Sequence, residues 1–415
     1  MGVAPTMTNM ASTFSRQNLP FGMMFALQFG ALGCWLPVFS LHLQDTLEFS
    51  GPEIGTILGV SSAAALFSPF IGALLSDRYI TARYLMALCH GVAGGMILWC
   101  SWTPSFLEVL VSMTLYQLVF TPSFALCNSI TFRFMEGGRE GFGLIRVWGT
   151  ISWMLVAWIL AVLLKVFPGG TSLALQASAL CSFGMVLLCL GLPSAEKVGS
   201  KKGSRFESLK LPPGIVTFFM SPPVVMLSLA SFLISMTFRF HFTGGGPYLS
   251  GVGCRVEWVL PALSAAQILE LWLLFRLKHH LKRWGYFGLM GLGGLICMVQ
   301  FSGLALNPGM GLAIFLMMGH GVTFTYFSTA LLMWMDTRVE KELHSSVHQL
   351  VVFIPSLAGV VGGYVSGWML EPAEKSANYI YFYGLPAGAA LIVLFLVLGA
   401  KWGENKVMAK RSSFE

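Results

Sequence analysis

The sequence predicts an all-α polytopic membrane protein, and two observations lead to this fold class. Of its 415 residues, 55% are hydrophobic and only 10% are charged, whereas charged residues make up about a quarter of an ordinary soluble domain. Long apolar stretches also recur along the chain, and a hydrocarbon core about 30 Å thick needs about 20 apolar residues per helix. We count twelve such segments: 20–43, 54–75, 82–101, 104–130, 142–166, 172–192, 219–242, 257–278, 284–304, 308–334, 345–370 and 377–400.

The basic residues give the expected orientation of these helices. Of the 25 Lys and Arg, Arg146 and Arg239 lie within apolar segments, and only Lys165, Arg255 and Lys375 lie in the loops that follow odd-numbered segments. The others lie at the termini and in the alternate loops, so the positive-inside rule predicts cytoplasmic termini. The N-terminus lacks the basic, apolar and small-residue succession of a cleaved signal peptide, and none is expected.

The motifs that would indicate an enzyme are missing from the sequence. The eight cysteines lie mostly in apolar segments, with no CxxC pair and no zinc spacing, so we expect no metal site. There is also no GxSxG, P-loop or HExxH motif, which argues against an enzyme and against an ATP-driven pump. A secondary transporter remains, without a cofactor and with an ion gradient as its energy source.

A carboxylate inside segment 257–278 is the first candidate functional residue. Glu270 lies deep in an apolar segment, where a charge costs roughly 2.5–3.5 kcal/mol and normally faces a cavity or a partner. Gln267 precedes it by three residues and shares its helical face. We interpret the two as a polar substrate-binding face, with Glu270 coupling transport to protons. The alternative is a structural ion pair between Glu270 and a neighbouring arginine.

The loop between the second and third segments carries a recognisable motif, made of Gly72, Asp77, Arg78 and Arg83. It resembles the cytoplasmic gating loop of the major facilitator superfamily. A charge pair at Asp77 can hold one conformation and release another, which predicts a gating role for the four residues. The alternative is a solvated loop that follows the charge rule only.

The fifth segment presents three further candidates on one face. Arg146, Thr150 and Trp153 are spaced i, i+4 and i+7, so they lie along one helical stripe. A fixed cation, a hydroxyl and an aromatic plate suit substrate binding. The alternative is that Arg146, one turn into the helix, extends to the cytoplasmic interface.

Several ordered pieces of the first half resemble one family. They are Phe29-Gly-Ala-Leu-Gly-Cys-Trp-Leu, Pro52-Glu-Ile-Gly, Phe67-Ser-Pro-Phe-Ile-Gly, Leu88-Cys-His, Thr121-Pro, Asn128-Ser-Ile and Arg146-Val-Trp-Gly-Thr. They look like the bacterial nucleoside:proton symporters of the major facilitator superfamily. In the second half the resemblance continues only in Gln267-Ile-Leu-Glu and Gly362-Gly-Tyr-Val-Ser-Gly.

The resemblance implies two six-helix halves built from three-helix inverted repeats, with the substrate site near mid-membrane. Residues 194–214, rich in Lys, Gly, Ser and Pro, read as a basic cytoplasmic linker. The predicted division is therefore an N-terminal half over 1–193, the linker, and a C-terminal half over 215–415.

The second half departs from the family at several positions. Three glycines precede Pro247, and we expect them to break the seventh helix and form a hinge. Arg239 and Phe242 stand where the family carries amide side chains, and Arg239 and His241 cannot share one helical face.

In the tenth segment, His320 stands where the family has Tyr, and Thr325 stands where it has an acid. Glu270 then remains the only candidate carboxylate for proton coupling, and His320 becomes either a second titrating group or a structural histidine. His320, Phe324 and Phe327 are spaced to share one helical face.

These observations predict a monomeric twelve-helix importer of a nucleoside and protons in the inner membrane, with no nucleic-acid partner. Trp153 and Phe324 would stack on the base, and polar groups would bond the hydroxyls or the base edge. The predicted substrate-binding residues are Arg146, Thr150, Trp153, Gln267, Glu270, His320 and Phe324. A transporter of a sugar or an anionic metabolite is the second hypothesis. Arg146 and Arg239 outnumber the single interior acid, Glu270, and the resulting net positive charge would favour an anion. A non-transporting sensor with the same fold is the third.

Overall fold

The computed structural model describes residues 17–76, 80–135, 142–167, 170–193, 215–338 and 344–412. The described chain is nearly all helix, and a helix covers each of the twelve predicted segments. The prediction of an all-α polytopic fold is therefore confirmed. The predicted linker at 194–214 lies outside the described residues, as do Asp77 and Arg78 of the predicted gating loop.

The helices of the first half begin with a segment that changes its winding along its length. This segment comprises α2 (Leu19–Trp35), η1 (Leu36–Val38), α3 (Phe39–Leu41) and η2 (His42–Thr46). The helices that follow are α4 (Gly51–Ser76), α5 (Ala82–Cys100), α6 (Phe106–Phe134), α7 (Phe142–Val166) and α8 (Ser172–Gly191).

The second half contains α9 (Ile215–Phe219), α10 (Pro222–Gly251) and α11 (Val256–Ala305), then α12 (Met310–Met317), α13 (Gly319–Thr323), η5 (Phe324–Thr329) and α14 (Ala330–Asp336), and finally α15 (His344–Lys375) and α16 (Ile380–Ser412). The elements α12 to α14 together form the predicted tenth segment, and η5 within it is a π-helix.

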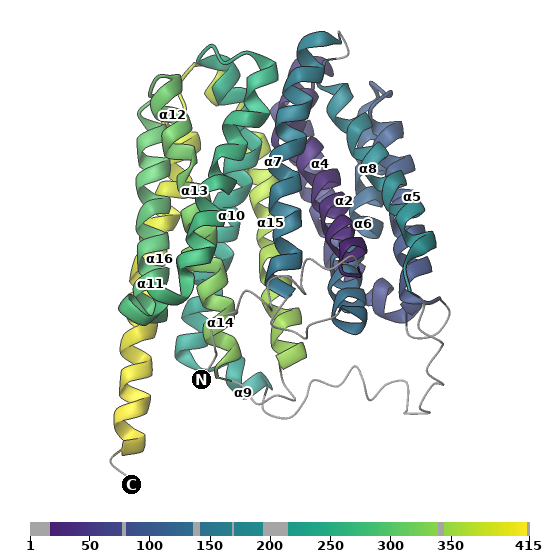
Figure 1. Ribbon diagram of the computed structural model, residues 1–415. Coiled ribbons are helices and arrows are strands. Elements are labelled where there is room, and N and C mark those ends of the chain that lie inside the picture. The colour runs from purple at the N-terminus through teal and green to yellow at the C-terminus, as the bar shows by residue number, and fades with distance from the viewer. Residues whose placement is uncertain are drawn as a thin grey trace. The chain divides into compact units, whose positions relative to one another are not determined.

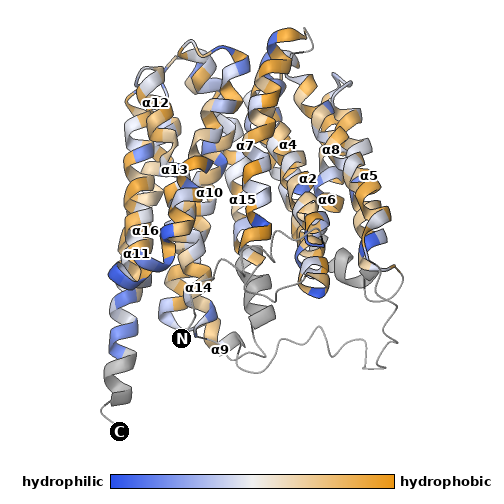
Figure 2. Ribbon diagram, viewed as in Figure 1, coloured by the Kyte–Doolittle hydropathy of each residue, from blue (hydrophilic) through white to orange (hydrophobic). Residues whose placement is uncertain are grey.

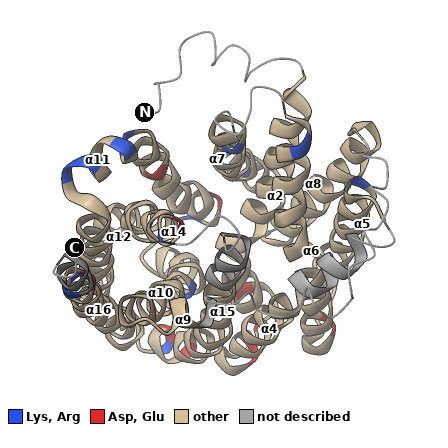
Figure 3. Ribbon diagram, turned by 90° about the horizontal axis from the view of Figure 1, so that it is seen from below, with Lys and Arg blue, Asp and Glu red and all other residues tan. Residues whose placement is uncertain are grey.

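Nine helices of the described chain are long and apolar enough to cross a membrane, and Figure 2 shows how apolar residues dominate their length. One of the nine, α11, contains two predicted segments. Gly285 divides them, with φ 67° and ψ 176°, a left-handed conformation that residues with a Cβ rarely adopt. The turn carries the basic residues of the predicted loop, visible as a blue stretch of α11 in Figure 3.

Contacts divide the chain into two units. Unit 1 contains residues 1–49, 60–201 and 255–264, and unit 2 contains residues 50–59, 202–254 and 265–415. In unit 1, α2 packs on α7 and α8, and α5 packs on α6 and α8. In unit 2, α10 runs beside α15 and α16 (Figure 1).

The helices of unit 1 pack through glycines that receive large rings. A Cβ on Gly149 of α7 would lie 2.6 Å from the Phe29 ring of α2, and one on Gly33 of α2 would lie 3.0 Å from the Trp153 ring. The Ser152 hydroxyl donates a hydrogen bond to the Ala26 carbonyl oxygen at 2.7 Å. Small residues of this kind let helices approach closely where lipid supplies no hydrophobic drive.

The first turns of α4 belong to unit 2, where they pack on α15. A Cβ on Gly55 would lie 2.7 Å from the Tyr364 carbonyl oxygen, and a Cβ on Gly51 would lie 2.8 Å from that of Gly367. The Glu371 carboxylate accepts a hydrogen bond from the Gly51 backbone N–H at 2.8 Å. It also forms an ion pair with Lys375.

The prediction that three glycines before Pro247 break a helix is wrong. The helix α10 continues through them to Gly251. Gly244 lies directly against the Phe382 ring of α16, where an added Cβ would overlap that ring. Gly244 therefore serves close packing, and a neighbouring helix stabilises the segment where its own sequence would favour a break.

Candidate functional site

The predicted substrate-binding residues fall into two groups, one in each unit. In unit 1, Arg146 is exposed and Thr150 is half-buried on α7. The Arg146 guanidinium carbon lies 4.9 Å from the centre of the Phe29 ring of α2. Stacking of this kind directs the planar cation without using all of its hydrogen-bond donors.

Trp153 differs from the other two residues of the predicted stripe. Its side chain is buried, with 8% of its surface exposed, and its ring packs on Gly33 of α2. This contact is enough to explain an aromatic residue here, and the stacking of Trp153 on a substrate base stays a prediction.

Two residues of the predicted gating motif lie within the described chain. The Arg83 guanidinium donates one hydrogen bond to the Leu192 carbonyl oxygen at 2.8 Å and another to the Tyr84 hydroxyl at 2.7 Å. Arg83 thereby joins the start of α5 to the end of α8, a favourable place for a cation near unpaired helix carbonyls. Gly72 lies in α4, and the gating role of the motif stays a prediction.

In unit 2, Gln267 and Glu270 lie one turn apart on α11. The Gln267 side chain is buried, and its Oε1 atom has no hydrogen-bond partner in the described chain. Buried polar atoms normally have a partner, so this oxygen is a candidate acceptor for a ligand. Glu270 is half-buried. Gly321 of α13 lies against the α11 backbone between Ala266 and Glu270. A Cβ added to Gly321 would lie 3.1 Å from the Glu270 backbone nitrogen.

His320 and Phe324 lie near a third ring, Phe238 of α10. The centres of the His320 and Phe238 rings are 4.5 Å apart, and those of Phe324 and Phe238 are 6.4 Å apart. The π-helix begins at Phe324, and its wider turn changes the direction of the residues after it. Phe327 is completely buried and packs on Gly293 of α11. The expected α-helical spacing between His320 and Phe327 therefore does not hold across this π-helix. Such π turns are frequent at functional sites.

The structure adds two residues that the sequence patterns did not single out as a group with His320. The His241 ring of α10 stacks on the His320 ring, with centres 4.4 Å apart and planes inclined by 1°. The Gln300 amide nitrogen of α11 lies 3.3 Å from His241 Nδ1. The sequence of each helix alone gives no sign of this cluster. The cluster arises only where α10, α11 and α13 meet.

Arg239 packs on α15 and not on the histidine cluster. Its Nη2 atom would lie 2.6 Å from a Cβ on Gly359, and its Cγ would lie 3.1 Å from one on Gly362. Within the described residues, no side chain forms a hydrogen bond or an ion pair with Arg239. Phe242, its neighbour in the predicted departure from the family, packs edge-on against His320 at 5.2 Å.

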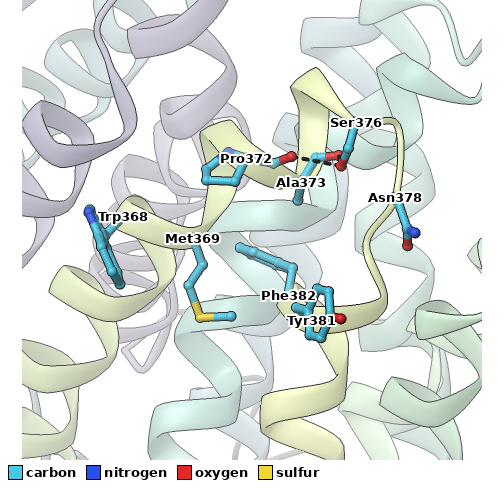
Figure 4. Close-up of a pocket in the computed structure, with 8 residues that line it drawn as sticks. All are labelled: Trp368, Met369, Pro372, Ala373, Ser376, Asn378, Tyr381 and Phe382. Carbon is cyan, nitrogen blue, oxygen red and sulfur yellow. Dashed lines mark hydrogen bonds between the residues drawn. The ribbon is translucent and has the colours of Figure 1, made fainter.

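A separate pocket of about 140 Å³ lies where α15 meets α16. Figure 4 shows Trp368, Tyr381 and Phe382 around it, with Ser376 and Asn378 at its polar side. None of the predicted site residues lines this pocket. In the described part of the chain, no three His, Cys, Asp or Glu side chains are grouped so as to hold a metal ion.

Comparison with known proteins supplies the family. The family model described as Nucleoside H+ symporter matches residues 16–402. The xanthosine permease of Escherichia coli is 23% identical over 84% of this chain and 87% of its own length. The nucleoside permease NupG of the same organism is 23% identical over 85% of this chain and 88% of its own.

The solved structures support the same fold. The crystal structure of the nucleoside transporter NupG superposes with a TM-score of 0.80 at 20% identity, over 93% of this chain and 99% of that one. A bacterial homologue of the human lysosomal transporter Spinster gives a TM-score of 0.71 at 14% identity, over 97% of this chain and 98% of that one. From the family match over nearly its whole length, this multi-pass membrane protein belongs to the nucleoside H+ symporters, which are transporters and not enzymes.

Proposed function

We propose that this protein takes up nucleosides together with protons across the inner membrane, by alternating access and with both termini in the cytoplasm. The observation that carries the proposal is the family match over residues 16–402. The two relatives named above are a xanthosine permease and a nucleoside permease, which favours a purine or pyrimidine nucleoside as substrate. The protein acts as a monomer, and the proton gradient is its energy source.

The side chains of unit 2 suit the polar part of such a substrate. Gln267 Oε1 is buried without a hydrogen-bond partner in the described chain, so a ribose hydroxyl or a base N–H can donate to it. Phe324 supplies an aromatic face one helical turn from His320. Glu270, one turn from Gln267, accepts the coupled proton in this proposal, because a carboxyl group inside a membrane protein is a natural proton carrier.

In unit 1, the Arg146 guanidinium over Phe29 supplies fixed donors for hydroxyl or carbonyl oxygens of the substrate. Thr150 adds a hydroxyl on the same face, and Trp153 an aromatic ring. Arg146→Ala should abolish uptake at normal membrane abundance. Arg146→Lys should also weaken binding, because lysine lacks the planar fork of donors. Wild-type affinity of the lysine variant would contradict a bidentate role.

Uptake by the purified protein in liposomes tests the proposal directly. With an imposed inward proton gradient, labelled uridine, adenosine, xanthosine and maltose are supplied separately, and competition ranks their affinities. Nucleoside accumulation that collapses when a protonophore is added is the expected result. Glu270→Gln should keep exchange of substrate and lose the uphill accumulation that the Glu270 proton drives. A glutamine variant that concentrates nucleoside to the wild-type level would place the coupling group elsewhere.

An anionic metabolite is the second candidate substrate, and Arg239 favours it. This guanidinium lies inside a long apolar helix and has no acidic partner among the described side chains. A carboxylate or phosphate of the solute would supply the missing charge. Uptake of an organic acid that nucleosides do not inhibit, lost in Arg239→Gln, would favour this candidate. Binding of solute without any uptake would favour a sensor.

A further inference from the structure

The histidine cluster of unit 2 has a geometry that aromatic packing alone does not require. His241 and His320 come from α10 and α13, and their rings stack face to face with centres 4.4 Å apart. Phe238 and Phe242 meet the His320 ring with their planes inclined by 70° and 77°. Only 2% of His241 and 6% of His320 is exposed. Two titratable rings are thus enclosed together in a membrane-spanning unit.

Gln300 gives the cluster a partner for either protonation state of His241. When the ring is neutral, the amide N–H donates to Nδ1 across the observed 3.3 Å. When Nδ1 carries a proton, the flipped amide accepts it with its oxygen, because glutamine offers both a donor and an acceptor. Gly319 leaves room for the Gln300 amide because it has no Cβ. A Cβ there would lie only 3.0 Å from Gln300 Oε1.

Stacked parallel rings at this distance can hold one added proton but not two. A single imidazolium is stabilised by the π face of its neutral neighbour. Two imidazolium charges at 4.4 Å would repel strongly in surroundings of low dielectric constant. Within the described chain, no ring nitrogen of His241 or His320 is both buried and without a hydrogen-bond partner.

The charged and titratable groups on the neighbouring helices make the following described contacts. On α10, Arg239 is directed toward Gly359 of α15. On α11, the Glu270 backbone nitrogen lies against Gly321, and the Cys297 thiol contacts the Thr237 hydroxyl at 3.4 Å. In the π-helix that follows α13, Tyr326 contacts His280 at 2.8 Å. The α15 and α16 faces against α10 meet Arg239 and Phe240 instead.

We propose that His241 and His320 form a proton-binding site that holds one proton between them, with Gln300 as its positioning residue. Water delivers the proton to a ring nitrogen in the conformation open to the outside, and the same nitrogen returns it to water inside. The inference rests on the proposed function, because the site then carries a coupled proton in addition to Glu270.

Imidazole NMR of the full-length protein in detergent tests the site without transport. Uniformly labelled histidine is titrated from about pH 8 to 5, where imidazole changes charge, and His→Gln variants assign each ring. We expect the two rings together to gain one proton. His90 should stay neutral. His280 is the positive reference, and desolvation with nearby His279, Arg276 and Arg283 lowers its pKa below the ordinary value. Two independent protons, or none, would overturn the proposal.

Transport provides the second arm. Under a one-unit pH gradient, loss of one coupled proton should lower the accumulation ratio by about tenfold, because one pH unit corresponds to a tenfold concentration ratio. His241→Gln should show this loss and keep substrate exchange, and His320→Gln should show the same loss of accumulation. His280→Gln is the matched control. Weaker nucleoside binding with full accumulation would make the pair a substrate contact and overturn the proposal. Absence of nucleoside uptake by the wild type would contradict the proposed function, and the NMR titration would still decide the site.

Discussion

Each unit contains a buried histidine beside a glutamine, and the two sites differ in what surrounds the pair. In unit 1, His90 Nε2 lies 2.9 Å from Gln28 Oε1, which also receives the Ser123 hydroxyl at 2.9 Å. His90 Nδ1 is sealed without a partner in the described chain. In unit 2, His241 has Gln300 on one nitrogen and a second imidazole against its face.

The difference lies in whether the site can accept a proton. A proton added to His90 Nδ1 would be a buried charged donor with no acceptor, which is costly. The Gln28 oxygen already serves several neighbours, so His90 and Gln28 form a fixed structural contact. The same two residue types in unit 2 have an amide that can reverse and a ring that can share charge. Residue identity therefore does not decide the role of a buried histidine, whereas its remaining neighbours do.

The largest expected effect is on stability and compares a tightly packed glycine near each site. Gly321→Ala would place a Cβ on the carbonyl oxygen of Ala266, a backbone atom that cannot rotate away. We expect a loss of about 3 kcal/mol or more, at the upper end for overpacked positions. Gly94→Ala, near His90, meets only the Phe183 ring at 2.9 Å and should cost less. Thermal unfolding in detergent measures both. Equal melting temperatures would show that α13 and α11 can move apart to accommodate the added methyl group.

The second prediction concerns the structural contact between Gln28 and His90. Gln28→Leu removes the acceptor of His90 and Ser123 and the 3.6 Å contact of the Cys127 thiol. Each buried group left unsatisfied costs about 1–3 kcal/mol, so the melting temperature should fall clearly. The proton dependence of uptake should not change in the protein that remains folded. An altered pH profile would mean that unit 1 also binds a coupled proton.

The third prediction is the counterpart in unit 2. Gln300→Leu keeps the side-chain size and removes the amide next to His241. Uphill accumulation should fall by up to about tenfold, equivalent to 1.36 kcal/mol for one pH unit, with a smaller loss of stability than in Gln28→Leu. Gln300→Glu, which retains an acceptor, should recover part of the coupling. A large stability loss with intact coupling would instead make Gln300 structural.

The smallest effect is expected at the glycine that borders the amide. Gly319→Ala would place a Cβ 3.0 Å from Gln300 Oε1, so the amide must move by a few tenths of an ångström. We expect a decrease in accumulation of about threefold, which is less than 1 kcal/mol. Gly311→Ala is the matched control, because an added Cβ there meets nothing within 4 Å. Identical accumulation by both variants would show that Gly319 does not influence the Gln300 amide.

The features predictable from the sequence are those that one helix carries by itself. Apolar length gave the segments, and the three-residue spacing put Gln267 and Glu270 on one side of α11. The stacking of His241 on His320 depends on how α10 meets α13, and helical spacing holds no information about that contact. The π-helix that begins at Phe324 could not be predicted either, because its sequence is compatible with an α-helix.

The glycines before Pro247 illustrate the opposite error. Their sequence is a strong signal for a break, and in water the prediction would be sound. Here the Phe382 ring of α16 fills the space over Gly244. The tertiary contact, made by a helix far along the chain, outweighs the local preference of α10.

The packing of α4 on α15 has a consequence for how the chain is made. Gly51 and the Glu371 carboxylate that binds its N–H are 320 residues apart in sequence. At a synthesis rate of about 5–20 residues per second, α15 follows the start of α4 by roughly 16 to 64 s. During that interval the glycine face of α4 has no α15 to pack against, and lipid or a membrane chaperone must cover it. The contact between α4 and α15 therefore forms only after α15 has left the ribosome.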